Sequence, residues 1–149
     1  MLLVIEDKGI VMKRYIYGDE LQFNRESYDG SLLCLSLNLN GIQHENWKAK
    51  NNKLKTFLKN YNFDIMGFQE VNINWDKVQS KDIWEERTMG WWKEGSTCTK
   101  AYNTQDILSS THQPGGCMVT SVNNVKRKVV SCGIDKRGLG RWIWTRYKA

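Results

Sequence analysis

Two short apolar runs flank one amphipathic segment, and this order limits the possible folds more than any other feature of the chain. The runs cover residues 32–37 and 63–68, and each is too short for a helix of normal length. We therefore expect two central strands that are buried on both faces. The segment between them, residues 47–61, repeats its apolar residues at helical spacing, at Trp47, Leu54, Phe57, Leu58 and Tyr61, and carries five lysines elsewhere on the helical wheel. The pattern predicts strand, helix, strand, with the helix lying on the sheet.

The rest of the chain divides into three parts. Residues 1–30 end at a turn signal, Tyr28-Asp29-Gly30, and we interpret them as an N-terminal extension of a domain covering 31–149. Residues 76–86 have a loosely helical pattern with Asp76 as a candidate N-cap. Beyond Gly116 the pattern predicts antiparallel strands at 117–122, 127–132 and 141–147, with turns at 123–124 and 135–140.

Positive charge is concentrated in the last quarter of the chain. The net charge is +6, yet residues 1–30 hold four basic and six acidic groups, so the excess belongs to the remainder. Between residues 126 and 148, eight basic residues face the single Asp135. This density favours a polyanionic partner such as nucleic acid, and a solvated basic edge is the alternative. The candidate nucleic-acid-binding residues are Lys126, Arg127, Lys128, Lys136 and Arg137.

Several classes of protein are disfavoured by what the sequence lacks. No apolar run approaches the ~18 residues of a membrane span, and Glu6 and Asp7 interrupt the apolar opening, so we expect no membrane partner and an intracellular, nuclear or cytoplasmic, protein. The four cysteines show no CxxC spacing, which favours reduced and mostly buried thiols. No phosphate-binding loop, dinucleotide fingerprint or HExxH motif is present.

Polar side chains terminate the two expected central strands. Asn38 follows the first strand and Glu70 follows the second. Ligands of open sheets bind beyond the carboxyl ends of the strands, so this amide and carboxylate could meet around one hard cation. A glutamate in this position could equally cap the next helix or pair with a surface lysine.

Four segments resemble landmarks of the endonuclease/exonuclease/phosphatase superfamily, in that family's order. They are LSLNLNG at 35–41, FDIMGFQE at 63–70, Gly115-Gly116, and GRWI at 140–143. The superfamily includes abasic-site endonucleases, deoxyribonuclease I and the endonuclease domains of LINE-type retrotransposons. The Asn-x-Asn-Gly form followed by a basic helix is most similar to the retrotransposon branch.

The resemblance implies a fold, a reaction and a site. The fold would be α/β, the N-terminal half of a four-layer αββα sandwich of the deoxyribonuclease I-like type, with mixed sheets and outer helices. The activity would be Mg²⁺-dependent phosphodiester cleavage, with Mn²⁺ as a possible substitute and DNA as the expected partner. By correspondence, Glu70 is the metal-ligand glutamate and Asn38 the active-site asparagine, while Asn40 stands where many abasic-site enzymes have an aspartate.

In the family, the remaining catalytic groups lie downstream of the GRWI segment. The resemblance therefore implies that residues 1–149 encode only half of an active site. We therefore expect the chain to be inactive alone and to associate through an exposed sheet face. A decayed mobile element, a gene-model fragment and a short protein with another role all remain open.

A second function also remains open: a small noncatalytic nucleic-acid-binding module that uses the basic residues with Trp142, Trp144 and Tyr147 as stacking surfaces. Strand alternation, however, favours core packing for Trp142 and Trp144.

Overall fold

The computed structural model describes residues 2–6, 9–13, 32–42, 49–105 and 110–148. The expected domain boundary at residue 30, Trp47 in the predicted helix and residue 149 lie outside these residues. The helices are α1 (Ala49–Asn60), α2 (Trp84–Arg87) and α3 (Asn123–Lys126), with 3₁₀ turns at Trp75–Lys77 and Ser80–Asp82. The strands are β1 (Leu2–Glu6), β2 (Gly9–Lys13), β3 (Leu32–Asn38), β4 (Ile65–Gln69), β5 (Ser96–Ala101), β6 (Cys117–Val122), β7 (Val129–Ile134) and β8 (Ile143–Tyr147).

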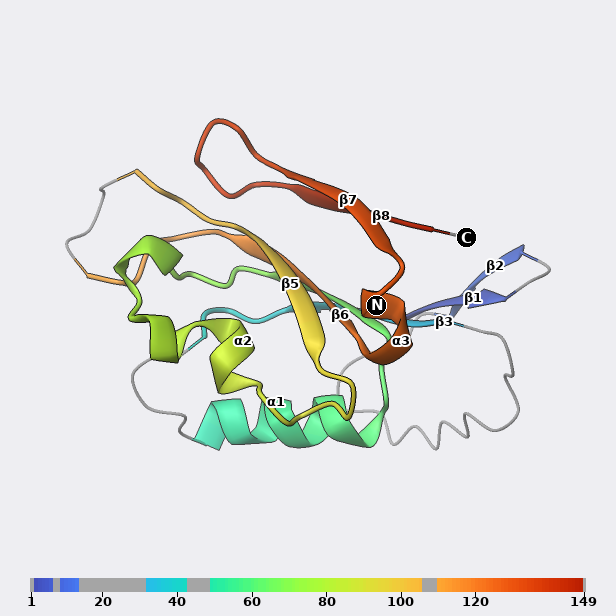
Figure 1. The fold of residues 1–149 in the computed structure, drawn as a ribbon. Coiled ribbons are helices and arrows are strands. Elements are labelled where there is room, and N and C mark those ends of the chain that lie inside the picture. The colour runs from blue at the N-terminus through green and yellow to red at the C-terminus, as the bar shows by residue number, and fades with distance from the viewer. Residues whose placement is uncertain (1, 7–8, 14–31, 43–48, 106–109, 149) are drawn as a thin grey trace.

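The first six strands form one mixed sheet in the order β2-β1-β3-β4-β6-β5. Within it β3 and β4 are parallel, and α1 connects them as the sequence predicts. The other neighbours are antiparallel, with β1 beside β3 and β6 between β4 and β5. The parallel pair therefore lies in the interior of the sheet, where its carboxyl ends share one edge (Figure 1).

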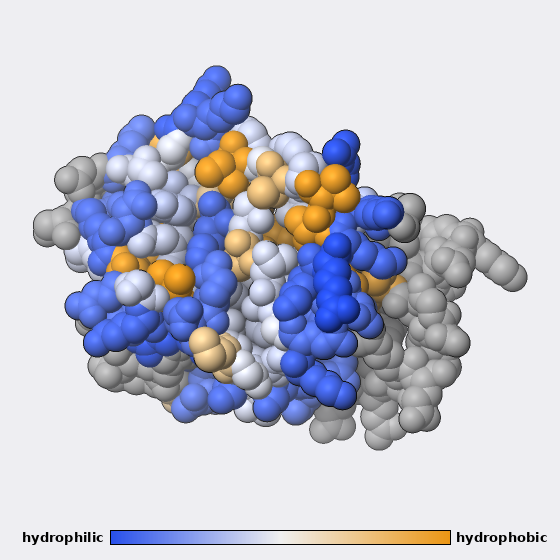
Figure 2. Space-filling view, viewed as in Figure 1, coloured by the Kyte–Doolittle hydropathy of each residue, from blue (hydrophilic) through white to orange (hydrophobic). Residues whose placement is uncertain are grey.

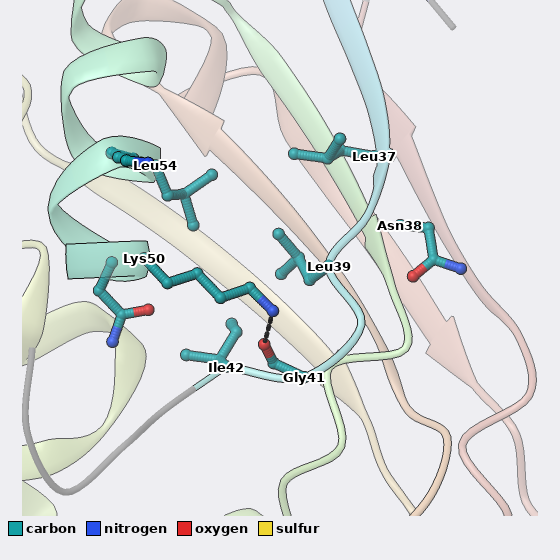
Figure 3. A pocket seen from close by; sticks show the side chains of 9 residues that line it. Leu37, Asn38, Leu39, Gly41, Ile42, Lys50 and Leu54 are labelled. Atoms are coloured by element: carbon teal, nitrogen blue, oxygen red, sulfur yellow. Dashed lines mark hydrogen bonds between the residues drawn. The ribbon is translucent and has the colours of Figure 1, made fainter. Parts of the chain in front are cut away.

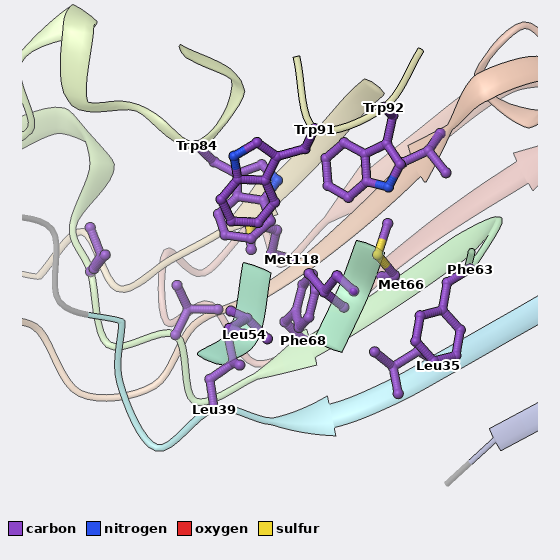
Figure 4. Close-up of a cluster of buried hydrophobic side chains, with 14 of the residues drawn as sticks. Leu35, Leu39, Leu54, Phe63, Met66, Phe68, Trp84, Trp91, Trp92 and Met118 are labelled. Atoms are coloured by element: carbon purple, nitrogen blue, oxygen red, sulfur yellow. The ribbon is translucent and has the colours of Figure 1, made fainter. Parts of the chain in front are cut away.

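The hydrophobic core lies between this sheet and the helices on one of its faces. Leu58 of α1 and Met66 and Phe68 of β4 are completely buried, and Trp84 and Trp91 continue the cluster (Figure 4). The Phe68 and Trp84 ring centroids are 5.5 Å apart, and those of Trp84 and Trp91 are 6.0 Å apart. Such tilted and edge-on ring pairs add about 0.5–1.5 kcal/mol each beyond the burial of their area.

The hairpin of β7 and β8 lies on the opposite face of the sheet from α1 (Figure 1). The Tyr147 hydroxyl of β8 is 2.7 Å from the Ser121 hydroxyl of β6, which links the hairpin to the sheet. A lone two-stranded hairpin is marginal in water, so contacts with the sheet such as this one help to stabilise it. Across the described ranges, no helix has the length and apolar character that crossing a membrane requires.

The strand–helix–strand prediction is confirmed for residues 32–37 and for the helix within 49–60. Leu54 and Leu58 are buried, and Phe57 and Tyr61 pack against the same cluster, as their spacing predicts. The second strand begins at Ile65, two residues later than expected. Residues 62–64 instead form the entry turn, in which Asn62 has φ 48°.

The helix predicted over 76–86 is wrong. This segment forms two 3₁₀ turns and the short α2. Asn74, and not Asp76, is the cap, since its Oδ1 accepts a hydrogen bond of 3.0 Å from the Asp76 backbone N–H. Burial of Trp75 and Trp84 in the core holds this irregular chain in place. The short turns follow from these tertiary contacts, which a local pattern does not contain.

The antiparallel last third is confirmed, with shifted boundaries. The strand at 117–122 is present, whereas β7 begins at Val129 because residues 123–126 form the helical turn α3. The third strand begins at Ile143 in place of 141, because the Asp135 N–H donates to the Trp142 carbonyl (3.1 Å) and closes the hairpin there.

Two burial predictions are wrong. Trp142 and Trp144 are each 48% exposed and are not core residues, because they lie on the hairpin, where no described element covers them. The cysteines are free thiols, as predicted, but they are not mostly buried: Cys132 is exposed, and Cys34, Cys98 and Cys117 are only partly buried as whole residues.

Candidate functional site

The carboxyl ends of β3 and β4 form a continuous rim. In the parallel register Asn38 lies beside Gln69, so Glu70 is the first residue beyond the pair. Backbone pairing continues past the strands, because the Leu39 N–H donates to the Gln69 carbonyl at 2.9 Å and the Gly41 N–H donates to the Glu70 carbonyl at 2.7 Å. The amide at 38 and the carboxylate at 70 therefore belong to one edge of the sheet, as the sequence predicts.

Asn38 and Asn40 share a tight turn after β3. The Asn38 Oδ1 accepts a hydrogen bond from the Asn40 N–H at 2.9 Å, and both side chains are exposed. Asn40 has φ 46°, a left-handed conformation that asparagine adopts more readily than most residues. An amide oxygen has two lone pairs, so the Asn38 Oδ1 can accept this hydrogen bond and still bind a second partner.

Glu70 is held in an unusual backbone conformation. Its φ is 50°, which is uncommon for a non-glycine residue. Regular alternation would place Glu70 on the face of Phe68, which the helices cover; the positive φ breaks the alternation, and Glu70 is exposed. Such conformations cost about 1–3 kcal/mol and are concentrated at functional sites.

Two residues that the sequence did not single out make hydrogen bonds in this region, Lys50 to the turn itself and Asn72 to the glycine segment before β6. The Lys50 ammonium of α1 donates to the Asn40 carbonyl at 3.0 Å and to the Gly41 carbonyl at 2.9 Å (Figure 3). Asn72 accepts at its Oδ1 from the Gly115 N–H, at 2.8 Å. Lysines are common on exposed helix faces, and only the fold shows that Lys50 is turned toward these carbonyls.

Leu37, Leu39, Ile42, Leu54 and Lys50 line a cavity of about 290 Å³ between α1 and the end of β3. Figure 3 shows the Asn38 side chain pointing away from this cavity, to the other side of β3. Asn38 is also among the residues that line the cavity, so the cavity adjoins the candidate site, although the Asn38 side chain itself points to the other side of β3.

Two polar landmarks of the second segment are structural. The Asp64 Oδ2 accepts from the Leu33 N–H at 2.8 Å, and the Asp64 N–H donates to the Leu33 carbonyl at 2.9 Å. The Gln69 amide donates to the Ser36 hydroxyl at 3.2 Å. These contacts fix the register of β4 against β3, and the register in turn places Glu70 beyond Asn38.

The glycine landmarks bring the remaining segments to the same end of the sheet. The Gly116 carbonyl accepts from the Val71 N–H at 3.1 Å, directly after Glu70. A Cβ at Gly140 would lie 2.7 Å from the Tyr102 Cα, so only glycine permits the hairpin tip to approach the end of β5 this closely. All four landmark segments therefore converge at one end of the sheet.

The five candidate nucleic-acid-binding residues do not form one surface. Lys136 and Arg137 are exposed in the hairpin tip, near the rim. Lys126, Arg127 and Lys128 lie at the other end of β7, where the Lys126 ammonium donates to the Glu94 carbonyl and Arg127 pairs with the Glu94 carboxylate at 3.2 Å. Tyr147 is half-buried and engaged with Ser121, so it is no open stacking surface.

Three ionisable groups near the rim have shifted pKa values. Hydrogen bonds from the backbone N–H groups of Arg137 and Arg141 lower the pKa of Asp135 despite some desolvation. Burial, with a hydrogen bond to Asp76, raises the pKa of Tyr102 to about 12. Burial and the nearby Asp135 charge raise the pKa of the Cys117 thiol. At neutral pH the hairpin tip therefore carries an ionised Asp135, and the neighbouring ends of β5 and β6 carry neutral Tyr102 and Cys117.

The rim residues offer oxygen donors for a metal ion. Within the described ranges no three His, Cys, Asp or Glu side chains gather into a metal-binding group. Glu70 with the amide oxygens of Asn38 and Asn40 would give one charged and two neutral ligands. This set suits Mg²⁺, a hard cation that keeps several waters and needs only one or two carboxylates. The donor chemistry fits a hydrated, partly protein-bound magnesium ion.

Comparison with known protein families places most of the chain in one family model. The family model described as Endonuclease/Exonuclease/phosphatase family matches residues 35–149, from β3 to the end of the chain. No curated protein matches the chain.

Proposed function

The chain belongs to the Endonuclease/Exonuclease/phosphatase family, and on that basis we propose that it carries the metal-binding half of a Mg²⁺-dependent phosphodiesterase that cleaves DNA. The family itself implies a phosphodiesterase- or nuclease-type hydrolase. The observation that carries the proposal is the shared rim: Asn38 and Glu70 follow adjacent parallel strands, and the backbone pairing continues between them.

Each rim residue has a proposed task. Glu70 supplies the charged metal ligand, while the Asn38 and Asn40 amides supply neutral oxygen donors, so the ion keeps most of its positive charge. When bound, Mg²⁺ stabilises negative charge on the phosphate and on the leaving oxygen. The strained Glu70 backbone and the Lys50 contacts fix these donors before any ligand arrives.

The sequence pattern supports the assignment of the chain to one branch of the family. Asn40 in the Asn-x-Asn-Gly turn and the lysine-rich α1 favour a LINE-type retrotransposon endonuclease over an abasic-site enzyme. The β7–β8 hairpin would be the beginning of the second sheet of a four-layer sandwich, since it lies on the face of the first sheet opposite α1.

The chain alone should not turn over substrate. A general base must lie within hydrogen-bond reach of the attacking water. Asp135, a carboxylate of the hairpin tip, accepts two backbone N–H bonds, and its lowered pKa makes it a weak base. We infer binding of metal and DNA without efficient cleavage.

The test is metal binding combined with a nicking assay. Calorimetric titration with Mn²⁺ should show one rim site that Glu70→Gln weakens by about tenfold or more, with Glu86→Gln as an exposed control. Supercoiled DNA with Mg²⁺ should remain uncut. Binding that Glu70→Gln leaves unchanged would exclude the site, and efficient nicking would exclude the inferred inactivity.

The noncatalytic nucleic-acid-binding module is the second candidate, and one observation favours it: Trp142 and Trp144 are exposed in the cationic hairpin. DNA binding measured with EDTA and with Mg²⁺ separates the two functions. If Mg²⁺ and Glu70→Gln leave the affinity unchanged while charge-removing changes in the hairpin weaken it, the module is the better description.

A further inference from the structure

The tip of the β7–β8 hairpin forms a hollow, which we call the tip hollow, of about 480 Å³. This volume is within the range of small-molecule sites in proteins. It is lined by Asp135, Lys136, Arg137, Arg141 and Trp142. The metal rim and the apolar cavity beside α1 are both elsewhere.

Three of the lining residues are exposed cations, and one is an exposed aromatic ring. Lys136, Arg137 and Arg141 are exposed, and Trp142 is 48% exposed. Guanidinium groups bind phosphate oxygens through paired hydrogen bonds, and an indole face stacks on a nucleobase. The combination matches the two parts of a nucleotide, a flat base and an anionic phosphate.

The one acidic residue that lines the tip hollow, Asp135, has a structural role. The Asp135 carboxylate accepts hydrogen bonds from the backbone N–H groups of Arg137 at 2.9 Å and Arg141 at 3.2 Å, and the residue is only 6% exposed. It thus organises the turn from within, while the cationic side chains remain at the surface. The hollow keeps a positive excess that favours an anion.

The tip hollow is fixed relative to the metal rim. The Thr104 N–H donates to the Gly138 carbonyl at 2.8 Å, and Asn103 pairs with Leu139, so the tip is tied to the chain after β5. Asn38, Gln69, Cys117 and Ala101 lie in register across β3, β4, β6 and β5. At ~4.8 Å between strands, Asn38 and Ala101 are roughly 14 Å apart. On a duplex this separation corresponds to about four base-pair rises of ~3.4 Å along the helix axis.

We propose that the tip hollow binds one unpaired nucleotide of a nucleic-acid strand whose neighbouring phosphates reach the rim of Asn38 and Glu70, with the base stacked on Trp142 and the phosphate held by Arg137 and Arg141. The proposal takes its ligand class from the proposed function and adds that the ligand is a strand with an accessible base. An acidic protein surface would use the cations, but it would engage the indole only where an aromatic or guanidinium side chain stands beside its carboxylates, whereas every nucleotide carries a flat base beside its phosphate.

The experiment compares two strands of equal length and charge, one carrying bases and one made of abasic units. Binding to the full chain is measured by fluorescence anisotropy in EDTA at low salt. The strand with bases should bind about 5- to 100-fold more tightly, which is the range for stacking of one base. Trp142→Ala should remove this preference without weakening binding of the abasic strand, and Trp142→Phe should retain most of it.

Matched variants distinguish binding in the tip hollow from nonspecific binding elsewhere on the chain. Trp144→Ala removes an equally exposed indole of the same hairpin that does not line the hollow, and it should change neither affinity by more than about twofold. The double change Arg137→Gln and Arg141→Gln should weaken both strands, whereas Lys59→Gln on α1 should weaken neither.

Equal affinity of the wild-type chain for the two strands would overturn the proposal, as would equal losses from Trp142→Ala and Trp144→Ala. Tighter binding of an acidic peptide than of the strand with bases would also overturn it. The strand-binding assay contains EDTA and no metal, so a negative result in it would not argue against the metal site. Likewise, a negative Mn²⁺ titration would not argue against nucleotide binding in the tip hollow.

Discussion

Glu70 is both a candidate metal ligand and a residue with a strained backbone conformation. Its positive φ is unfavourable for a side chain with a Cβ, and the pairing of Leu39, Gly41 and Val71 around it holds the conformation. The surrounding fold therefore maintains a geometry that the isolated residue would avoid. A purely structural residue at this position would more favourably be glycine or asparagine.

We expect Glu70→Gly to be more stable than Glu70→Ala by roughly 0.5–2 kcal/mol, because glycine adopts positive φ without strain. Both variants should lose metal binding, since neither has a carboxylate. Urea unfolding measures the first effect and Mn²⁺ titration the second. If Glu70→Ala were as stable as Glu70→Gly, the backbone at 70 would be unstrained.

Asp135 should make the stability of the chain depend on pH at the acidic end. Its folded pKa is lowered from the ordinary 3.8 by backbone N–H groups, so its ionised form stabilises the fold above that pH, and the contribution is lost as pH falls through the folded pKa. Asp135→Asn should therefore be less stable than wild type at pH 7, with the gap narrowing below about pH 4. Urea unfolding at pH 7, 5 and 3 tests this; a gap that widens in acid would contradict it.

At the scale of elements, helices and strands could be predicted from the sequence where the local apolar pattern matches the burial of the same residues in the fold. The runs that form β3 and β4 are strands as predicted, but only one face of each is fully buried and the other stays partly exposed, so the expected burial on both faces is wrong; α1 buries the leucines that its spacing places on one face. This order also places Asn38 and Glu70 at one edge of the sheet. The conformation of Glu70 and the contacts of Lys50 and Asn72 depend on segments far apart in sequence, so only the structure shows them.

Beyond β1 and β2, for which the sequence analysis predicted no strands, three differences between prediction and structure have a common cause. Strand β5, with the sequence STCTKA, is an edge strand with polar residues on its less covered side, so it lacks an apolar run. The segment 75–87 is held by buried tryptophans and not by helical spacing. Trp142 and Trp144 alternate like core residues but lie on a hairpin that presents them to solvent. Tertiary position, and not local pattern, decided each case.

Lys50 connects α1 to the turn that carries Asn38 and Asn40. Lys50→Met keeps the aliphatic stem but removes the two hydrogen bonds to the Asn40 and Gly41 carbonyls. We expect a loss of about 0.5–2 kcal/mol in stability and a severalfold weaker Mn²⁺ affinity, because the turn is less fixed. Lys53→Met, one turn along the same helix, is the control. Unchanged metal affinity in Lys50→Met would show that the turn needs no such support.

At the scale of the whole molecule, the exposed side of the hairpin is an apolar surface of the described residues. Val130 and Ile134 are 53% and 42% exposed, and Figure 2 shows hydrophobic residues gathered over the upper part of the molecule, where the hairpin lies. β7 and β8 form a two-stranded sheet, so each also has one edge without a partner in that sheet. Exposed apolar faces and open strand edges favour association.

We expect the isolated chain to self-associate at micromolar concentrations through this face. The double variant Val130→Lys and Ile134→Lys should shift the chain toward monomer, while Met89→Lys, an exposed apolar residue of another region, should not. Sedimentation velocity across a concentration series measures the change. A wild-type chain that stays monomeric throughout would show that the face needs no cover.

The convergence of four separated segments at one end of the sheet is the central claim about the whole molecule, and a shared metal site at Asn38 and Glu70 is its most direct consequence. Paramagnetic Mn²⁺, added in small amounts to the ¹⁵N-labelled chain, identifies the amide signals nearest the ion. We expect broadening first at residues 38–41 and 69–72, and its loss in Glu70→Gln with the remaining spectrum unchanged. Broadening confined to the acidic residues of 76–86, or broadening that survives Glu70→Gln, would contradict the account.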